Sequence, residues 1–282
     1  MAESKKKKPQ LLWQIDKPGL PGTSYLFGTM HVRDIRAFDY KDLVCEKILC
    51  CDAFATEINL NQAELLLGEQ SMDLPEGQTL DSLFSKKKYA KIARFFQKTT
   101  GMSIQHFERA KPMMLTNFIT SSFLNNDQPL SLDQFFWKFA EDENRILLGI
   151  ETVEEQIDLM ARIPIDYQAK ALWSMVKNIS RYRKNLLKLS TLYQEGNLSK
   201  ILKSAKKSMG KLRKMMIYDR NEVMAHRIGL LIGEQTLFAA VGAGHLGGNK
   251  GILKKLKSAG YSLKCIPNHP NHSTQLASKD NL

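Results

Sequence analysis

Four residues that could bind a metal or move a proton stand directly behind short apolar segments of the sequence. They are His31, Glu57, Glu151 and His245. In open α/β sheets, ligands bind just beyond the carboxyl ends of strands. A strand end can place a polar group in a cleft, whereas a buried strand interior holds an unpaired charge only at high cost. We therefore predict that these two histidines and two glutamates converge on one polar site.

Two imidazoles and two carboxylates form a suitable donor set for a divalent ion such as Mn²⁺, Co²⁺ or Zn²⁺. A bound ion of this kind lowers the pKa of a water molecule and polarises a carbonyl group. In this interpretation His31 and His245 are ligands, and Glu57 and Glu151 share the roles of ligand and general base, in either order. In the alternative interpretation, the histidines are hydrogen-bonded structural residues. Glu151 then only interacts favourably with the dipole of the helix that follows it.

Arg220 and Asn221 form a second candidate pair inside a long helical segment. An arginine fork can hold a carboxylate or a developing oxyanion, and the alternative is an ordinary surface charge. The sequence contains no G-x-S-x-G, P-loop or H-E-x-x-H motif, so these signals of serine hydrolases, P-loop nucleotide binding and zincins are absent. No C-x-x-C pair supports a zinc knuckle or a thioredoxin-like site.

The pattern of apolar segments predicts an α/β fold with a central mixed β-sheet, flanked by helices and carrying a large helical insert or cap. Two capping boxes, Ser131 with Gln134 and Thr152 with Glu155, mark helix starts. The expected strands cover residues 11–16, 24–29, 52–58, 145–150, 236–241 and 261–266. The expected helices cover residues 38–50, 61–68, most of 86–142, a segment from Thr152 to about Pro164, almost all of 165–232, and 249–259.

The predicted organisation is a single α/β domain over residues 11–267, with the helical cap at about 86–142 and 165–232. A basic disordered N-terminus over 1–10 and a polar flexible tail over 268–282 are expected on either side. No apolar stretch approaches the ~20 residues that a spanning helix needs, so we predict no transmembrane segment. The sequence as given predicts a cytoplasmic location, and an exported or periplasmic one if a signal peptide has been removed.

The chain of 282 residues carries a formal net charge of +12. Such a surplus is typical of a solvated basic surface, and it also suits nucleic acid, an anionic surface or an acidic substrate. A lysine-rich face within residues 200–214 could contact an anionic surface. No aromatic residues interleave these lysines, which argues against stacking with a single-stranded nucleic acid, and nucleic acid is not the partner that we expect.

Six motifs in order along the chain resemble those of the TraB/PrgY/GumN family, which includes the Tiki-type metalloproteases. The first is the segment from Leu12 to Ile15 with Pro18-Gly19, followed by Ser24 to His31. The others are Thr56-Glu57-Ile58, Leu74 to Leu80, Leu148 to Gln156, Arg220-Asn221 and Val241 to Leu246. Gly247 departs from the family pattern, which often has proline there.

The resemblance implies an α/β fold similar to that of erythromycin esterases and ChaN-like haem-binding proteins. It also implies that His31, Glu57, Glu151, Arg220, Asn221 and His245 are site residues. Many bacterial relatives are exported, which leaves location and natural substrate open. From the residues and the resemblance together we predict a metal-dependent hydrolase, most readily a peptidase acting on a peptide or small-molecule substrate. The alternative is a non-catalytic protein that binds a peptide or a small haem-like ligand in the same pocket.

Overall fold

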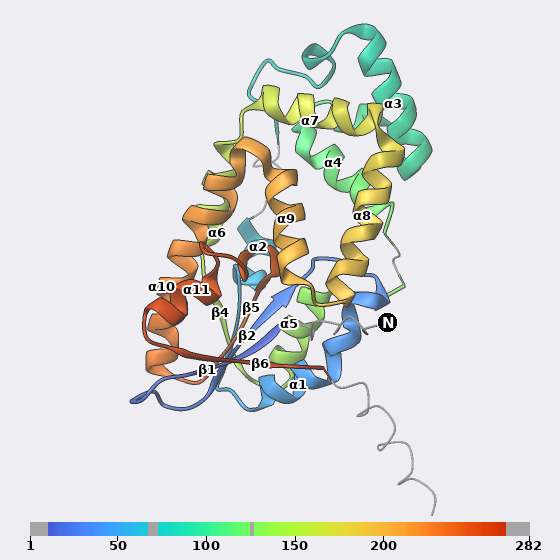
Figure 1. Cartoon of the computed structure of the whole chain (residues 1–282). Coiled ribbons are helices and arrows are strands. Elements are labelled where there is room, and N and C mark those ends of the chain that lie inside the picture. The colour runs from blue at the N-terminus through green and yellow to red at the C-terminus, as the bar shows by residue number, and fades with distance from the viewer. Residues whose placement is uncertain (1–10, 67–72, 125–126, 269–282) are drawn as a thin grey trace, which may run out of the picture.

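The computed structural model describes residues 11–66, 73–124 and 127–268 (Figure 1). The predicted N-terminal segment 1–10 lies outside these residues, and so does the predicted tail except for Asn268. The last two residues of the predicted helix 61–68 also lie outside them.

A six-stranded mixed sheet forms the centre of the fold and confirms the predicted α/β class. The strands lie in the order β4-β3-β5-β2-β1-β6. The first four run parallel to one another, whereas β1 pairs antiparallel with both β2 and β6. Their bounds are β1 (Leu12–Asp16), β2 (Ser24–Thr29), β3 (Ala53–Thr56), β4 (Ile146–Gly149), β5 (Leu237–Gly242) and β6 (Ser262–Ile266).

Local sequence signals explain several helix starts. Both predicted capping boxes form, and Pro112 occupies the first turn of its helix. The helices on the N-terminal side are η1 (Ile35–Tyr40), α1 (Lys41–Leu49), α2 (Leu60–Leu66), α3 (Lys86–Thr100), α4 (Pro112–Ser121), α5 (Leu132–Asp142) and α6 (Val153–Ala161). Those that follow are α7 (Ile165–Lys177), α8 (Ile179–Gln194), α9 (Leu198–Met209), the π-helix η6 (Lys214–Asp219), α10 (Arg220–Glu234), η7 (Ala243–His245) and α11 (Ile252–Ser258).

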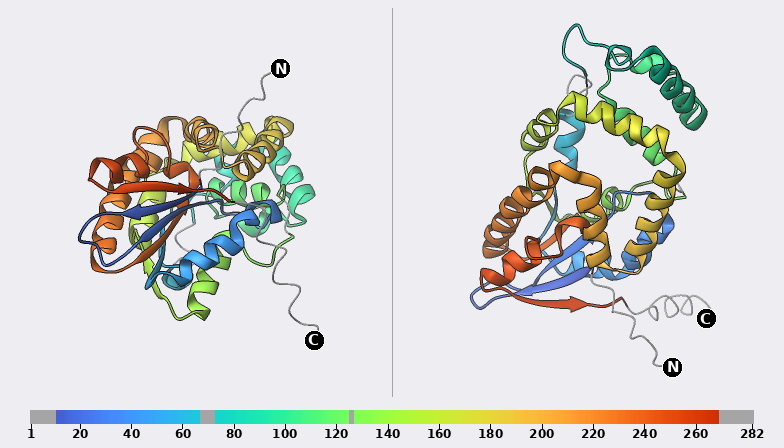
Figure 2. Two further views of the ribbon diagram at one scale, coloured as in Figure 1. Left: turned by 60° about the horizontal axis from the view of Figure 1, so that its bottom comes forward. Right: turned by 45° about the horizontal axis from the view of Figure 1, so that its top comes forward.

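The helical segment predicted over 165–232 is divided into several elements. Asn178 separates α7 from α8, and a turn containing Gly196 separates α8 from α9. Gly210 then ends α9 with a positive φ of 50°. The turn containing Gly196 lets the chain fold back on itself, so that α8 and α9 lie side by side (Figures 1 and 2).

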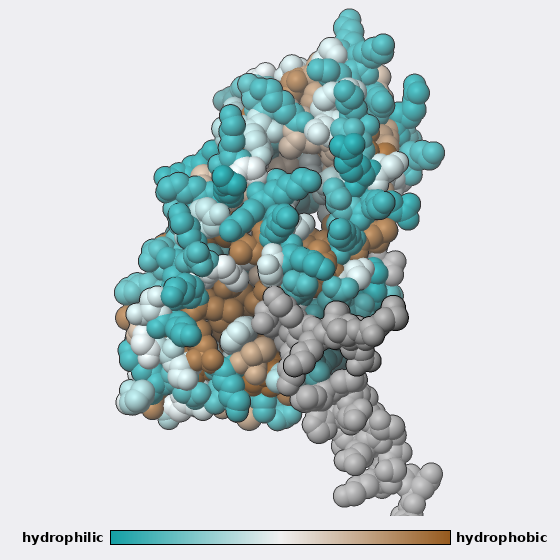
Figure 3. Space-filling view, viewed as in Figure 1, coloured by the Kyte–Doolittle hydropathy of each residue, from teal (hydrophilic) through white to brown (hydrophobic). Residues whose placement is uncertain are grey.

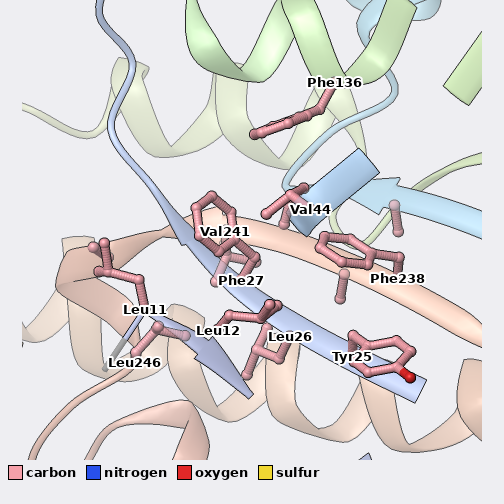
Figure 4. Close-up of a cluster of buried hydrophobic side chains, with 14 of the residues drawn as sticks. Leu11, Leu12, Tyr25, Leu26, Phe27, Val44, Phe136, Phe238, Val241 and Leu246 are labelled. Carbon is pink, nitrogen blue, oxygen red and sulfur yellow. The ribbon is translucent and has the colours of Figure 1, made fainter. Parts of the chain in front are cut away.

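Helices cover both faces of the sheet. On one face the ring of Phe27 in β2 meets that of Phe136 in α5, with centroids 5.9 Å apart in an edge-to-face arrangement. Leu26 points to the opposite face, because successive side chains of a strand alternate (Figure 4). The helices α10 and α11 pack together and contact β5 and β6. The sheet is thus buried in one continuous hydrophobic core.

A second hydrophobic core lies in the helical part formed by α3, α4 and α7. It is built around Phe96, Leu115 and Leu172, all fully buried. This part occupies the end of the molecule farthest from β1 and β6 (Figures 1 and 2). The large helical insert expected from the sequence is therefore present and packs largely on itself.

The visible helical surface is mainly hydrophilic, with hydrophobic residues gathered near the middle and lower part of the face in Figure 3. On α9, Lys200, Lys203 and Lys207 are exposed, while Ile201 and Leu202 are buried. The contact of this lysine face with an anionic surface stays a prediction. Among the described residues, no helix combines the length and apolar character needed to cross a bilayer.

Candidate functional site

The carboxyl ends of four neighbouring strands meet at one edge of the sheet and carry the predicted residues. Because β4, β3, β5 and β2 are parallel, the residues that follow them emerge on the same side. Glu57 directly follows β3, and Glu151 comes two residues after β4. The backbone N–H of Glu151 donates to the carbonyl of Glu57 at 2.7 Å, which extends the strand pairing into the site.

Arg220 joins the two glutamates. Its Nε donates to Oε1 and Oε2 of Glu151 at 3.0 and 3.1 Å, and its Nη2 donates to Oε2 of Glu57 at 2.6 Å. Burial opposes the charge on Arg220, but hydrogen bonds to Glu151 and attraction to Glu57 outweigh it and raise the pKa of the guanidinium. A planar arginine fork is well suited to hold two carboxylates in fixed positions.

His245 is oriented by Asn221. The Asn221 amide nitrogen donates to the carbonyl of Lys250 at 2.7 Å, so its Oδ1 faces Nδ1 of His245 at 2.6 Å. This arrangement assigns the imidazole proton to Nδ1 and leaves a lone pair on Nε2, which lies 3.9 Å from Oε1 of Glu57. Burial lowers the pKa of His245, which favours the neutral ring.

The Glu57 carboxylate is held ionised by its surroundings. Its Oε1 accepts from the backbone N–H of Gly242 at 2.8 Å, and its Oε2 accepts from Arg220. Burial alone would raise the pKa of Glu57, but the positive charges of His245, when protonated, and Arg220 outweigh it and lower the pKa to about 2. Because burial also keeps His245 mostly neutral, we regard Arg220 as the main source of this effect.

His31 lies at the rim of the same site and is not part of this network. Its side chain is 78% exposed, and its Nδ1 lies 3.4 Å from Oδ2 of Asp133 in the first turn of α5. The contact with the Asp133 carboxylate outweighs burial and raises the pKa of His31. The backbone N–H of Leu132 donates to the carbonyl of Val32 at 3.0 Å and brings α5 next to His31. No sequence signal pointed to Asp133, because it reads as an ordinary acidic residue at a helix start.

Glycines let the backbone approach the site closely. A Cβ at Gly149 would lie 2.6 Å from the backbone nitrogen of Asn59, and one at Gly242 would lie 3.2 Å from Oε1 of Glu57. Residues 242–247 also fit the G-x-G-x-x-G spacing of dinucleotide-binding turns. Here that segment forms the short turn η7, and the next α-helix begins only at Ile252, so no helix N-terminus is presented at the turn.

A pocket of about 370 Å³ opens above these polar groups. Glu57, Arg220 and His245 line its polar end, and His31 lines its edge. Tyr193 also contributes to the wall, and its hydroxyl donates to the carbonyl of Gly28 at 2.8 Å. A cavity of this size can hold a small molecule or a short piece of peptide.

Of the six predicted site residues, the structure brings five together as two hydrogen-bonded groups, Glu57–Arg220–Glu151 and Asn221–His245, which meet where Nε2 of His245 lies 3.9 Å from Oε1 of Glu57. It places His31 on the wall of the same pocket. Within residues 11–66, 73–124 and 127–268, no three His, Cys, Asp or Glu side chains lie close enough together to hold a metal ion as they stand.

The fold and the site together define an α/β protein whose parallel strand ends carry a carboxylate–arginine–histidine network. The chain belongs to the TraB/PrgY/gumN family, with a match that covers residues 11–264. No solved structure matches it significantly.

Several curated relatives are named metalloproteases. Metalloprotease TIKI2 of Danio rerio is 24% identical over 94% of this chain and 62% of its own length. Metalloprotease TIKI1 of Homo sapiens is 24% identical over 91% of this chain and 62% of its own length. A metalloprotease TIKI homolog of Amphimedon queenslandica is 24% identical over 89% and 60%, respectively. This chain therefore spans about three fifths of the length of these relatives.

Proposed function

We propose that this chain is a metal-dependent hydrolase that cleaves amide bonds at the polar end of the pocket, as a peptidase of the TIKI kind. The observation that carries the proposal is the network of Glu57, Glu151, Arg220 and His245 at the base of a pocket. Buried charges that are fixed by one another and face a cavity are typical of catalytic sites. The names of the TIKI relatives support the same class of reaction.

The donor types of His31, Glu57 and His245 suit a divalent ion, and we propose that these three side chains, which do not lie close enough together as they stand, move closer together to hold it. Each of the two imidazoles has an oxygen atom beside its Nδ1, from Asp133 for His31 and from Asn221 for His245. Proteins commonly orient metal-binding histidines through this second nitrogen, which leaves Nε2 for the ligand. When bound, a divalent ion supplies Lewis acidity that activates water and polarises a carbonyl.

We assign different roles to the two glutamates. Glu57 has one oxygen 3.9 Å from Nε2 of His245, and its low pKa keeps it anionic throughout the physiological pH range. It is therefore suited to be a ligand and is a weak proton acceptor. Both oxygens of Glu151 are bonded to Arg220, so Glu151 acts as a positioning residue for the guanidinium.

Arg220 is placed to stabilise negative charge on a substrate. Its Nε and Nη2 are used by the two carboxylates, and among the described residues Nη1 has no hydrogen-bond partner. We propose that Nη1 donates to the carbonyl oxygen of the scissile amide as charge develops there. A fixed donor of this kind typically contributes about 10²–10³-fold to the rate.

The proposal is tested by metal analysis and peptide digestion of the purified, tag-free chain. Wild-type protein is incubated with a peptide library with and without added Mn²⁺, Co²⁺ or Zn²⁺, and products are identified by mass spectrometry. We expect a bound divalent ion and metal-dependent cleavage. The variants His245→Ala and Glu57→Gln should lose both. His226→Ala, which changes an exposed histidine on α10, should keep both.

Two outcomes contradict the proposal. If wild-type protein binds no divalent ion and His245→Ala digests peptides as well as His226→Ala does, the site is not catalytic in this way. If peptides raise the melting temperature of the wild type but no product forms with any metal, the chain is a binding protein instead. The largely apolar wall of the pocket favours this second function over other non-catalytic roles.

A further inference from the structure

Much of the wall of the pocket is apolar. Two helices and the π-helix contribute it, and each turns an apolar side chain inward. These side chains are Leu189 from α8, Ile201 and Met209 from α9, and Met216 and Ile217 from η6. Tyr193 presents its ring, because its hydroxyl is already bonded to the carbonyl of Gly28. A ligand that fills the pocket must therefore cover apolar surface on this side.

The polar end of the pocket disfavours a negatively charged group. Glu57 and Glu151 bring two negative charges, and Arg220 offers a single positive charge that both of them share. In the metal-free chain, an acidic side chain would lose its hydration in the pocket without gaining a cation of its own, so the binding experiment below uses metal-free protein.

The size of the pocket sets a limit on the group that enters. A volume of about 370 Å³ takes one large side chain together with the amide group beside it. The three methionines that line the pocket, Met30, Met209 and Met216, are unbranched and can adapt to side chains of different shape. The pocket thus offers a polar end for an amide and an adaptable apolar wall for its neighbour.

From the combination of a polar end and an apolar wall we infer that the pocket is a subsite for a large apolar side chain of a peptide, such as leucine, methionine or phenylalanine. The amide group beside this side chain reaches Arg220 and His245. That such a peptide is cleaved beside this residue rests on the proposed function, whereas that it binds in the pocket does not. Removing one methylene from a hydrophobic subsite typically costs tenfold or more in discrimination.

Binding is measured first, with small probes and without turnover. The apolar probes N-acetyl-L-leucinamide and N-acetyl-L-phenylalaninamide are titrated into metal-free wild-type protein and into the Glu57→Gln variant. Their affinities are compared with those of N-acetylglycinamide and N-acetyl-L-aspartate amide. NMR line broadening or calorimetry measures each affinity. We expect the two apolar probes to bind the wild-type protein at least tenfold more tightly than the glycine and aspartate probes. Equal affinity for all four probes would overturn the inference.

Two pocket variants and one control variant test whether this preference arises in the pocket. Ala205→Phe introduces a ring at a position that lines the cavity, and should weaken the leucine and phenylalanine probes at least tenfold. Ala90→Phe adds the same ring at an exposed position of α3 and should change nothing. Met216→Ala enlarges the cavity and should raise the affinity ratio of the phenylalanine over the leucine probe. Circular dichroism and thermal melts confirm that each variant is folded.

The subsite and the hydrolase proposal fail in different ways. If the probes bind with the expected preference and no peptide is cleaved, the subsite stands and the hydrolase proposal is wrong. If peptides are cleaved with no preference for a large apolar residue beside the cut, and Ala205→Phe cleaves like Ala90→Phe, the subsite is wrong and the hydrolase proposal stands.

Discussion

The ring nitrogen Nδ1 of His245 lies 2.6 Å from the amide oxygen of Asn221, whose own nitrogen is fixed by the carbonyl of Lys250. The amide thus determines which imidazole nitrogen carries the proton and which direction Nε2 faces. Asn221 is only 1% exposed, so water does not readily replace this contact. The orientation of His245 depends on a residue that does not line the pocket itself.

We expect Asn221→Ala to weaken divalent metal binding about 10–100-fold, as is usual when the partner of a liganding histidine is removed. It should also lower the free energy of unfolding by about 1–3 kcal/mol, because the carbonyl of Lys250 loses its donor. Isothermal titration and urea denaturation measure the two effects. Asn185→Ala, at an exposed position of α8, is the control. Unchanged metal affinity in Asn221→Ala would show that the amide does not orient the ring.

Gly149 is required for the close approach of β4 to the segment that follows β3. An added Cβ would lie 2.6 Å from the backbone nitrogen of Asn59 and 2.8 Å from the carbonyl oxygen of Glu151. We expect Gly149→Ala to destabilise the chain by about 1–3 kcal/mol, as overpacking does, and to displace Glu151 from Arg220. Gly233→Ala, in a helix with no atom within 4 Å of the new methyl, should instead stabilise by about 0.5–1 kcal/mol. Chemical denaturation of both variants tests this contrast.

Glu155 connects the start of α6 to α10 through a paired contact with Arg227. The two hydrogen bonds measure 2.6 and 2.7 Å, and the Arg227 guanidinium, opposed by partial burial, holds the pKa of Glu155 at about 2. Since the ordinary value is 4.5, this contribution to stability is complete above about pH 4.5 and is lost as the pH falls towards 2. Glu155→Gln should cost about 1 kcal/mol or less at pH 7, and clearly less at pH 3.5.

Urea denaturation of Glu155→Gln and wild type at pH 7, 5.5 and 3.5 measures this difference. Glu154→Gln changes the neighbouring exposed carboxylate and serves as the control. A difference between wild type and Glu155→Gln that grows as the pH falls would contradict the assignment of the pair.

Asp133 controls the protonation of His31. Because its carboxylate lies beside Nδ1 and raises the pKa of that imidazole, we expect Asp133→Asn to return the pKa of His31 towards 6.5. An NMR titration of the histidine Cε1 protons measures the change. Asp142→Asn, at the other end of α5, removes an ion pair with Lys138 and should leave the His31 titration unaltered. A His31 curve that does not move in Asp133→Asn would mean that the two side chains do not interact in solution.

Strand direction explains why the sequence could predict much of the site. Glu57, Glu151 and His245 each follow an apolar segment, and all three segments become parallel neighbours in the sheet. Residues at the carboxyl ends of such strands must emerge along one edge. The local helix signals at Ser131 and Thr152 were confirmed for the same reason, because they depend only on residues three positions apart.

Contacts between distant residues could not be predicted in this way. The pairing of His31 with Asp133 depends on where α5 packs, and the sequence gives no periodic signal for that position. Arg220 was identified as a candidate, but its simultaneous contact with two glutamates follows only from the three-dimensional arrangement. The π-helix before Arg220 was likewise expected as regular helix, since its apolar spacing is close to that of an α-helix.

The two hydrophobic cores divide the helices in a way that protects the pocket. The buried residues Leu192, Tyr193 and Ile201 of α8 and α9 belong to the core around the sheet, whereas α3, α4 and α7 share the other core. Partial unfolding of α3, α4 and α7 would therefore leave α8 and α9, which line the pocket, in place. Hydrogen exchange should report two cooperative units, with the amides of α3 and α4 exchanging through an opening that does not expose those of α9. The chain can thus tolerate loosening at one end while its binding cavity keeps its shape.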